Sequence, residues 1–133
     1  MSVAMIAQGT FEIQMTAEPP YAEVEGVALA RATFTKQFSG TLTATSTVHM
    51  LGARGPVAGS AGYVALEQIS GTLDGRDGTF VVMHTGQMAR GEAKLEITVV
   101  PDSGTGGLRG LRGRMQIDRT GGLHSYVLDY ELA

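Results

Sequence analysis

The sequence predicts an all-β protein, folded as a closed eight-stranded antiparallel barrel of the up-and-down type. Helical periodicity is nearly absent, because Gly, Thr or Val interrupts every window that begins to place apolar residues at helical spacing. Apolar and polar residues instead alternate along eight segments, which is the period of a strand. The links between segments are short, and an even number of strands lets the last lie antiparallel beside the first. Closure then removes both exposed edges of the sheet.

Turn-forming residues, chiefly Gly, Pro, Ser and Asp, separate the eight predicted strands. In chain order the strands are expected over 6–16, 25–38, 41–50, 61–73, 78–88, 93–100, 110–118 and 123–132.

The first three strands are bounded by clear turn signals but differ in how well their faces can be assigned. In the first strand, every second residue of the run FEIQM is apolar, so Phe11 and the apolar residues after it are taken to point inward. Pro19-Pro20 places a loop after this strand. Ser39-Gly40 is expected to join the second and third strands as a two-residue hairpin turn. Both faces of these two strands mix apolar residues with Lys, Arg or His, so either face could point inward.

The fourth and fifth strands predict an apolar inward face that carries two ionisable groups. With Asp74–Asp77 as a four-residue turn, Glu67 lies opposite His84 across the hairpin, and Tyr63 lies opposite Met88. Burying an ionised carboxylate without a partner costs several kcal/mol, so Glu67 and His84 are expected to pair.

A carboxylate and an imidazole that face each other inside an apolar wall can act as general acid and base. Glu67 and His84 are therefore the candidate catalytic residues. The alternative is a structural hydrogen-bonded pair that fixes the register of the sheet.

The last three strands continue the apolar inward face. The turn Ala89–Glu92 places Met88 opposite Ala93, and the turn Arg119–Gly122 joins the final two strands, in which every second residue is apolar or Gly. The inward-facing residues expected to contact a ligand are Tyr63, Phe11, Met88, Met115 and Tyr126. The alternative is a lumen that side chains fill completely, as small eight-stranded barrels permit.

The order of the strands also predicts which end of the barrel is open. The loops 17–24 and 51–60 and the turns 89–92 and 119–122 fall at one end, which is expected to be the mouth. The segment Pro101–Arg109 falls at the other end and is expected to act as a plug.

The Gly-rich run that follows the sixth strand has a distinctive spacing. The run SGTGGLRGLRG, Ser103–Gly113, resembles the Gly-Thr-Gly-x-x-x-Gly-x-x-Gly stretch of the allene oxide cyclase and dirigent barrels. The chain as a whole resembles a bacterial family of unknown function in that barrel clan, through Thr35–Gly40, Tyr63–Gly86 and Tyr126–Glu131. The resemblance implies an eight-stranded barrel with a central cavity. Characterised members of the clan cyclise, isomerise or stereochemically guide small apolar molecules.

The composition of the chain argues against several classes of partner and cofactor. The chain has 133 residues, 43% hydrophobic and 17% charged, which fits one domain over 1–133, and its net charge of -3 offers no broad positive field for nucleic acid or an anionic membrane. It has no Cys, and its three His residues lack the local spacing of metal ligands, so neither a metal nor another cofactor is predicted. The N-terminal sequence lacks the features of a signal peptide, and a cytoplasmic location is expected.

The sequence therefore predicts a barrel that binds a small apolar molecule in its lumen. One interpretation is a cofactor-independent isomerase or cyclase, and a second is a non-catalytic carrier or sensor. A third is a structural module that forms a homo-oligomer through its outer wall.

Overall fold

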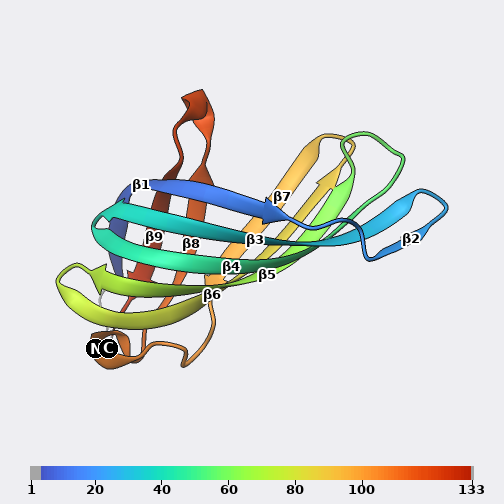
Figure 1. The fold of residues 1–133 in the computed structure, drawn as a ribbon. Coiled ribbons are helices and arrows are strands. Elements are labelled where there is room, and N and C mark those ends of the chain that lie inside the picture. Colours follow the sequence, from blue (N-terminus) through green and yellow to red (C-terminus); the bar gives the residue numbers. More distant parts are fainter. Residues whose placement is uncertain (1–3, 133) are drawn as a thin grey trace.

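The computed structural model describes residues 4–132 and shows an antiparallel sheet that closes into a barrel (Figure 1). The strands are β1 (Ala4–Ala17), β2 (Ala22–Val24), β3 (Val27–Gly40), β4 (Leu42–Arg54), β5 (Ala61–Leu73), β6 (Arg76–Ala89), β7 (Glu92–Val99), β8 (Arg112–Asp118) and β9 (Ser125–Glu131). Pairing runs in the order β1-β9-β8-β7-β6-β5-β4-β3, and β1 pairs again with β3, which closes the ring. The predicted eight-stranded barrel is confirmed.

A short additional strand extends β3 beyond the ring. β2 lies in the segment 17–24, which was expected to be a loop, and within residues 4–132 it pairs only with the first residues of β3. Among residues 4–132, no helix has the length and apolar character needed to cross a membrane.

The turn between β5 and β6 is shorter than the sequence suggested. Asp74 and Gly75 both have positive φ, 47° and 82°, as the central residues of a type I′ hairpin turn do. Leu73 therefore pairs with Arg76, and the expectation of a four-residue turn with Leu73 opposite Gly78 was wrong. The pairing is displaced by two residues, so every side chain stays on its predicted face. The predicted pairing of β6 with β7 is confirmed.

Ser39 and Gly40 do not form the predicted two-residue turn. Both residues pair with β1, where Gly9 lies opposite Gly40, and Phe38 pairs with Ala44 instead. The two backbones approach closely here, because a Cβ atom at Gly9 would lie 1.9 Å from the carbonyl oxygen of Ser39. A side chain at either position would disturb this junction of β1, β3 and β4.

The inward faces of β3 and β4 are the ones that carry Lys36 and Ser46. Lys36 is 6% exposed and Ser46 is also buried, whereas Arg31 and His49 point outward. Lys36 follows the same alternation as Phe34 and Phe38 along β3. The lumen therefore contains a lysine and a serine that the alternation alone could not place.

One end of the barrel is filled by a packed aromatic core. The Phe38 ring lies 5.6 Å from Phe11 and 5.3 Å from Tyr126, measured between ring centroids. The Tyr126 hydroxyl accepts a hydrogen bond from the backbone N–H of Leu42 and lies within hydrogen-bond distance of the Ser39 carbonyl oxygen, both at 3.0 Å. These contacts join β1, β3, β4 and β9 across the lumen.

The Gly-rich segment closes the same end, as expected for a plug. Leu108, in the short 3-10 helix η1 (Gly106–Leu108), is 1% exposed and packs in the core. The backbone N–H of Thr105 donates to the carbonyl of Thr79 at 2.8 Å, which holds the segment against β6. A Cβ atom at Gly104 would lie 1.8 Å from the carbonyl oxygen of Leu108, so the fold of the plug requires glycine there.

The barrel wall is weakest between β7 and β8. Within the described residues these strands pair only through Ile97 with Met115 and Thr98 with Arg114, whereas β5 pairs with β6 along its whole length. Toward the mouth, β7 diverges from β8 (Figure 1). Leu95 lies in this diverging part and is 42% exposed.

Candidate ligand-binding site in the barrel lumen

The half of the lumen nearest the mouth is hollow. It contains a cavity of about 390 Å³, within the range of about 300–1,000 Å³ that is usual for small-molecule sites. The walls are mainly apolar, with cationic and imidazole groups at intervals. The lining residues are Phe11, Ile13, Met15, Phe34, Lys36, Val48, Met50, Tyr63, His84, Leu95, Ile117, Arg119 and His124.

The cavity leads outward to a wider hollow of about 510 Å³ at the mouth. The two share Met15, Met50, Tyr63, Leu95 and Arg119 as lining residues. A molecule entering at the mouth would therefore pass between these side chains to reach the inner cavity.

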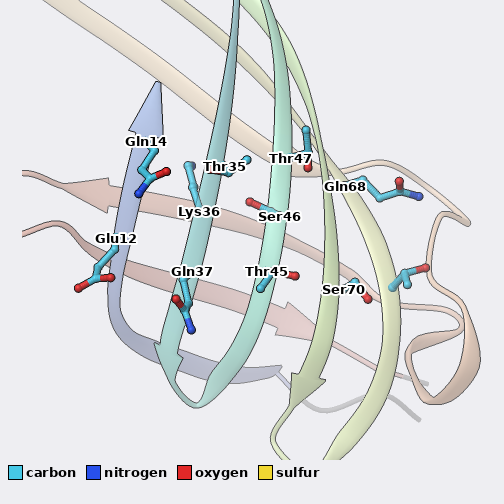
Figure 2. Close-up of a pocket in the computed structure, with 11 residues that line it drawn as sticks. Glu12, Gln14, Thr35, Lys36, Gln37, Thr45, Ser46, Thr47, Gln68 and Ser70 are labelled. Carbon is cyan, nitrogen blue, oxygen red and sulfur yellow. The ribbon is translucent and has the colours of Figure 1, made fainter. Parts of the chain in front are cut away.

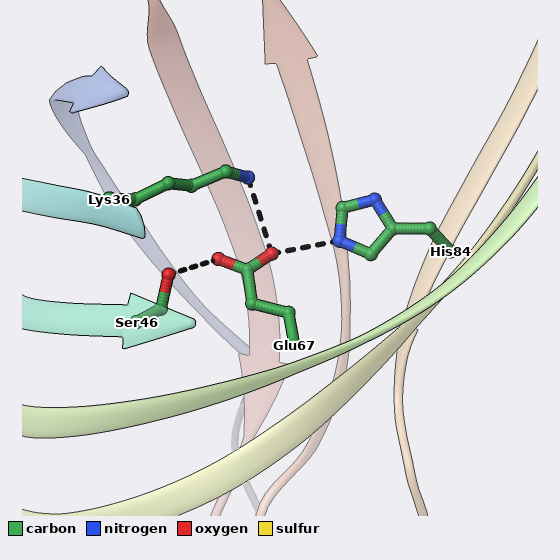
Figure 3. A network of polar contacts seen from close by, with 4 residues as sticks. All are labelled: Lys36, Ser46, Glu67 and His84. Atoms are coloured by element: carbon green, nitrogen blue, oxygen red, sulfur yellow. Dashed lines mark hydrogen bonds and ion pairs between the residues drawn. The ribbon is translucent and has the colours of Figure 1, made fainter. Parts of the chain in front are cut away.

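A buried polar cluster lies at the inner side of the cavity, formed by Lys36, Ser46, Glu67 and His84 (Figure 3). We call it the Glu67 cluster. Oε1 of Glu67 lies 3.2 Å from Nζ of Lys36 and 2.8 Å from Nε2 of His84, and Oε2 accepts a hydrogen bond of 2.6 Å from the Ser46 hydroxyl. An ionised carboxylate can only accept, so Nε2 of His84 carries the proton.

Four neighbouring strands, β3 to β6, each contribute one member of this cluster. Glu67 pairs directly with Val48 and Val82, so it reaches Ser46 and His84 along the diagonals of the sheet. The sequence placed Glu67 directly opposite His84. The contact is present but diagonal, because the β5–β6 turn is two residues shorter than expected.

Hydrogen bonds and charge keep Glu67 ionised although its side chain is 0% exposed. Burial acts to raise the pKa of Glu67, but the His84 hydrogen bond, the Lys36 charge and the Ser46 hydroxyl together hold that pKa below its usual value. Burial lowers the pKa of Lys36, and the charge and hydrogen bond of Glu67 offset this only in part. The cluster thus contains a stable carboxylate beside an amine that is easier to deprotonate than a surface lysine.

The Glu67 cluster should make the barrel sensitive to acid. Below the usual glutamate pKa of 4.5, the unfolded chain binds a proton at this position more readily than the folded chain does. The free energy of unfolding should therefore fall as pH decreases from 4.5 through the folded pKa of Glu67. Urea denaturation over a pH series should show a shallower fall in Glu67→Gln, which cannot titrate there. Equal slopes in both proteins would contradict the lowered pKa.

Comparison with known proteins agrees with this fold. A model of the family described as "Protein of unknown function (DUF3224)" matches residues 7–130. The chain belongs to the DUF3224 family. Among solved structures, it is similar to that of a protein with unknown function from the DUF3224 family of Shewanella oneidensis MR-1, with 43% sequence identity, a TM-score of 0.93 and coverage of 98% of each chain. No curated protein matches the chain.

The five residues predicted to contact a ligand occupy three different environments in this DUF3224 barrel. Phe11 lines the inner cavity, and Tyr63 lines both the cavity and the mouth. Met88 lies at the mouth and is partly exposed. Met115 and Tyr126 point inward but belong to the packed core and do not line the cavity. The structure thus brings Phe11 and Tyr63 together with His84 around one cavity.

Three ionisable residues that line the cavity were not predicted from the sequence to do so: Lys36, Arg119 and His124. Arg119 and His124 flank the 3-10 turn η2 (Thr120–Gly122) between β8 and β9, where strand alternation carries no information. The His124 ring stacks on Phe11 at 5.2 Å between centroids, and its carbonyl accepts a hydrogen bond from the N–H of Phe11. Predicting the contact between His124 and Phe11 would have required the pairing of β1 with β9, which closes the barrel.

A second hollow lies on the outer face of the DUF3224 barrel, across β1, β3, β4, β5 and β6 (Figure 2). Polar residues line it: Glu12, Gln14, Thr35, Lys36, Gln37, Thr45, Ser46, Thr47, Gln68, Ser70 and Thr79. Apart from Lys36 and Ser46, whose side chains are buried, these are mostly exposed Thr, Gln and Ser of the outward-facing alternation. We interpret this surface as a solvated strand face.

Proposed function

We propose that the barrel binds a small, mostly apolar molecule in its lumen, with the Glu67 cluster at the polar end of the site. One observation carries the proposal: the 390 Å³ cavity has a mainly apolar wall that includes the imidazole of His84 and the amine of Lys36, both bonded to the buried carboxylate of Glu67. Polar groups buried at the end of an apolar pocket typically fix the orientation of a ligand.

The same geometry supports a proton-transfer reaction without a cofactor. His84 lines the cavity and directs Nε2 to Glu67, so Nδ1 holds the lone pair that can accept a proton from a bound molecule. The Glu67 carboxylate then stabilises the imidazolium that forms. His84 can return the proton to another atom of the same molecule, which would complete an isomerisation or cyclisation.

The likeness of Ser103–Gly113 to the allene oxide cyclase and dirigent barrels supports the same class of ligand. We place the chain with that clan as part of this proposal. A non-catalytic carrier would use the same cavity, so binding is tested first and turnover second. In an enzyme, His84→Gln would abolish turnover while leaving affinity within a few-fold.

An uncharged fluorescent probe, N-phenyl-1-naphthylamine, tests binding in the lumen directly. Its fluorescence should rise on addition of the protein. Ile13→Trp, which enlarges a side chain lining the cavity, should weaken binding by about tenfold or more, equivalent to about 1.4 kcal/mol.

Ile6→Trp is the matched control, because Ile6 lies on the same strand, β1, but points outward and is exposed. It should leave the affinity for the probe unchanged. Equal loss of binding in both variants, or no binding by the parent, would contradict the proposed site.

A further inference from the structure

Lys36 is the member of the Glu67 cluster that proton transfer by His84 does not require. Its side chain is 4% exposed, and it lines the inner cavity. Nζ lies 4.9 Å from the centroid of the Phe11 ring and 5.8 Å from that of Phe38, and 3.2 Å from Oε1 of Glu67. An amine is thus held between aromatic rings and a carboxylate at the wall of an apolar cavity.

We propose that Lys36 is a nucleophile that condenses reversibly with the aldehyde or ketone group of an apolar molecule bound in the lumen, forming an imine. The inference rests on the proposed function, because the carbonyl compound must first enter the cavity. It adds a substrate class, apolar carbonyl compounds, to that function.

The groups around Lys36 can supply each proton that the condensation needs. Burial favours the neutral amine, and its nitrogen lone pair forms a bond to the carbonyl carbon. The C=O π electrons move to the oxygen, which takes up a proton while the nitrogen releases one, and this gives a neutral carbinolamine. The C–O bond then breaks and the oxygen leaves with a second proton as water, while the nitrogen forms the C=N bond and releases its remaining proton. Amine and carbonyl become imine and water, and no oxidant or reductant is consumed.

His84 is placed to provide the protons for this sequence. Its Nε2–H is bonded to the same Glu67 oxygen that faces the Lys36 amine, so a proton released by Lys36 enters a network that His84 shares. His84 also lines the cavity, where the carbonyl oxygen would lie. Because Nε2–H is directed to Glu67, His84 first takes up a released proton at Nδ1, and the imidazolium then donates it to that oxygen and makes it a leaving group.

The surroundings of the amine favour both the formation and the survival of an imine. Burial lowers the pKa of Lys36, so a larger fraction of the amine is neutral, and the positive charge of Arg119 acts in the same direction. Phe11, Phe38 and Val48 are buried around this part of the lumen. They limit the access of water, which would hydrolyse the imine.

The chain offers an internal control, because it contains only two lysines, Lys36 and Lys94. Lys94 is exposed on β7 at the mouth. The protein is incubated with benzaldehyde and sodium cyanoborohydride, which reduces any imine to a stable benzylamine. Peptide mass spectrometry then locates the benzyl group. Lys36 should be labelled about tenfold faster than Lys94 or more, because the cavity holds the apolar aldehyde beside its amine.

Variants and competition separate the failure of this inference from that of the proposed function. Lys36→Arg should lose the fast labelling, and Lys94→Arg should keep it. If Lys36→Arg does not fold, prior binding of N-phenyl-1-naphthylamine to the parent should slow labelling at Lys36 and leave Lys94 unaffected. Equal labelling of both lysines would overturn the imine. If the probe still binds in that case, the lumen site stands without a covalent step, and if it does not bind, both proposals fail.

Discussion

Glu67→Leu is expected to lower the free energy of unfolding by about 3–5 kcal/mol, because it leaves the Lys36 ammonium buried without its counter-ion. Lys36→Met should cost somewhat less, because Glu67 keeps the hydrogen bonds from His84 and Ser46. The double variant Lys36→Met/Glu67→Leu should be more stable than the sum of the two losses implies. Replacing both charges by apolar side chains removes the unpaired ion altogether. Urea denaturation at neutral pH measures all four proteins.

The exposed ion pair between Arg112 and Glu131 provides the control for this cycle. Its atoms are 3.3 Å apart, close to the 3.2 Å between Lys36 and Glu67, but its two side chains are 69% and 45% exposed. Arg112→Met should therefore change the stability by about 0.5 kcal/mol or less, because solvent screens surface pairs. Additive losses in the Lys36 and Glu67 variants would show that the two groups do not interact, contrary to the geometry of the Glu67 cluster.

Phe38→Ala is expected to destabilise the barrel by about 3–5 kcal/mol, the usual cost of removing a fully buried aromatic side chain. The Phe38 ring contacts Phe11 and Tyr126 and lies close to the amine of Lys36, so its loss opens a cavity between the core and the Glu67 cluster. Thermal or urea denaturation would measure the effect.

Phe34→Ala is the matched comparison on the same strand. Phe34 also points inward from β3, but it is only partly buried and lines the cavity rather than the packed core. Its loss should cost clearly less than that of Phe38. An equal loss of unfolding free energy at both positions would indicate that the two halves of the lumen are equally packed. That result would contradict the cavity.

The architecture could be predicted from the sequence because alternation and short turns depend on neighbouring residues. The β5–β6 hairpin illustrates how robust this signal is. The predicted length of the turn at Asp74 was wrong by two residues. Glu67 and His84 nevertheless lie on the predicted inward face, because a displacement of two residues preserves the alternation. β2 was missed because it has only three residues and lies beside a proline pair.

The inward face of β3 could not be predicted, because the burial of Lys36 on that face depends on a residue far away in the chain. Lys36 is buried only because Glu67, 31 residues later, accepts its hydrogen bond. Local alternation contains no information about such a partner. Placing an isolated lysine in the lumen would have appeared unfavourable.

Alternation also identifies which side chains point inward, but it does not show which part of the lumen along the barrel axis is filled by side chains. Tyr126 and Tyr63 both point inward, yet one belongs to the core and the other lines the cavity. The difference arises from the plug around Leu108 and the aromatic core around Phe38, which fill one end only. Packing between distant segments therefore decides which residues can contact a ligand.

The central claim, that a small apolar molecule binds inside the barrel, is tested most directly by methionine-methyl NMR. The chain has seven methionines, of which Met15 and Met50 line the cavity, while Met83 points outward from β6 and is partly exposed. With ¹³C-methyl labelling, N-phenyl-1-naphthylamine should shift the Met15 and Met50 signals and leave Met83 unchanged. Shifts concentrated at Met83, or none at Met15 and Met50 when the probe is in excess, would show that the lumen does not bind it.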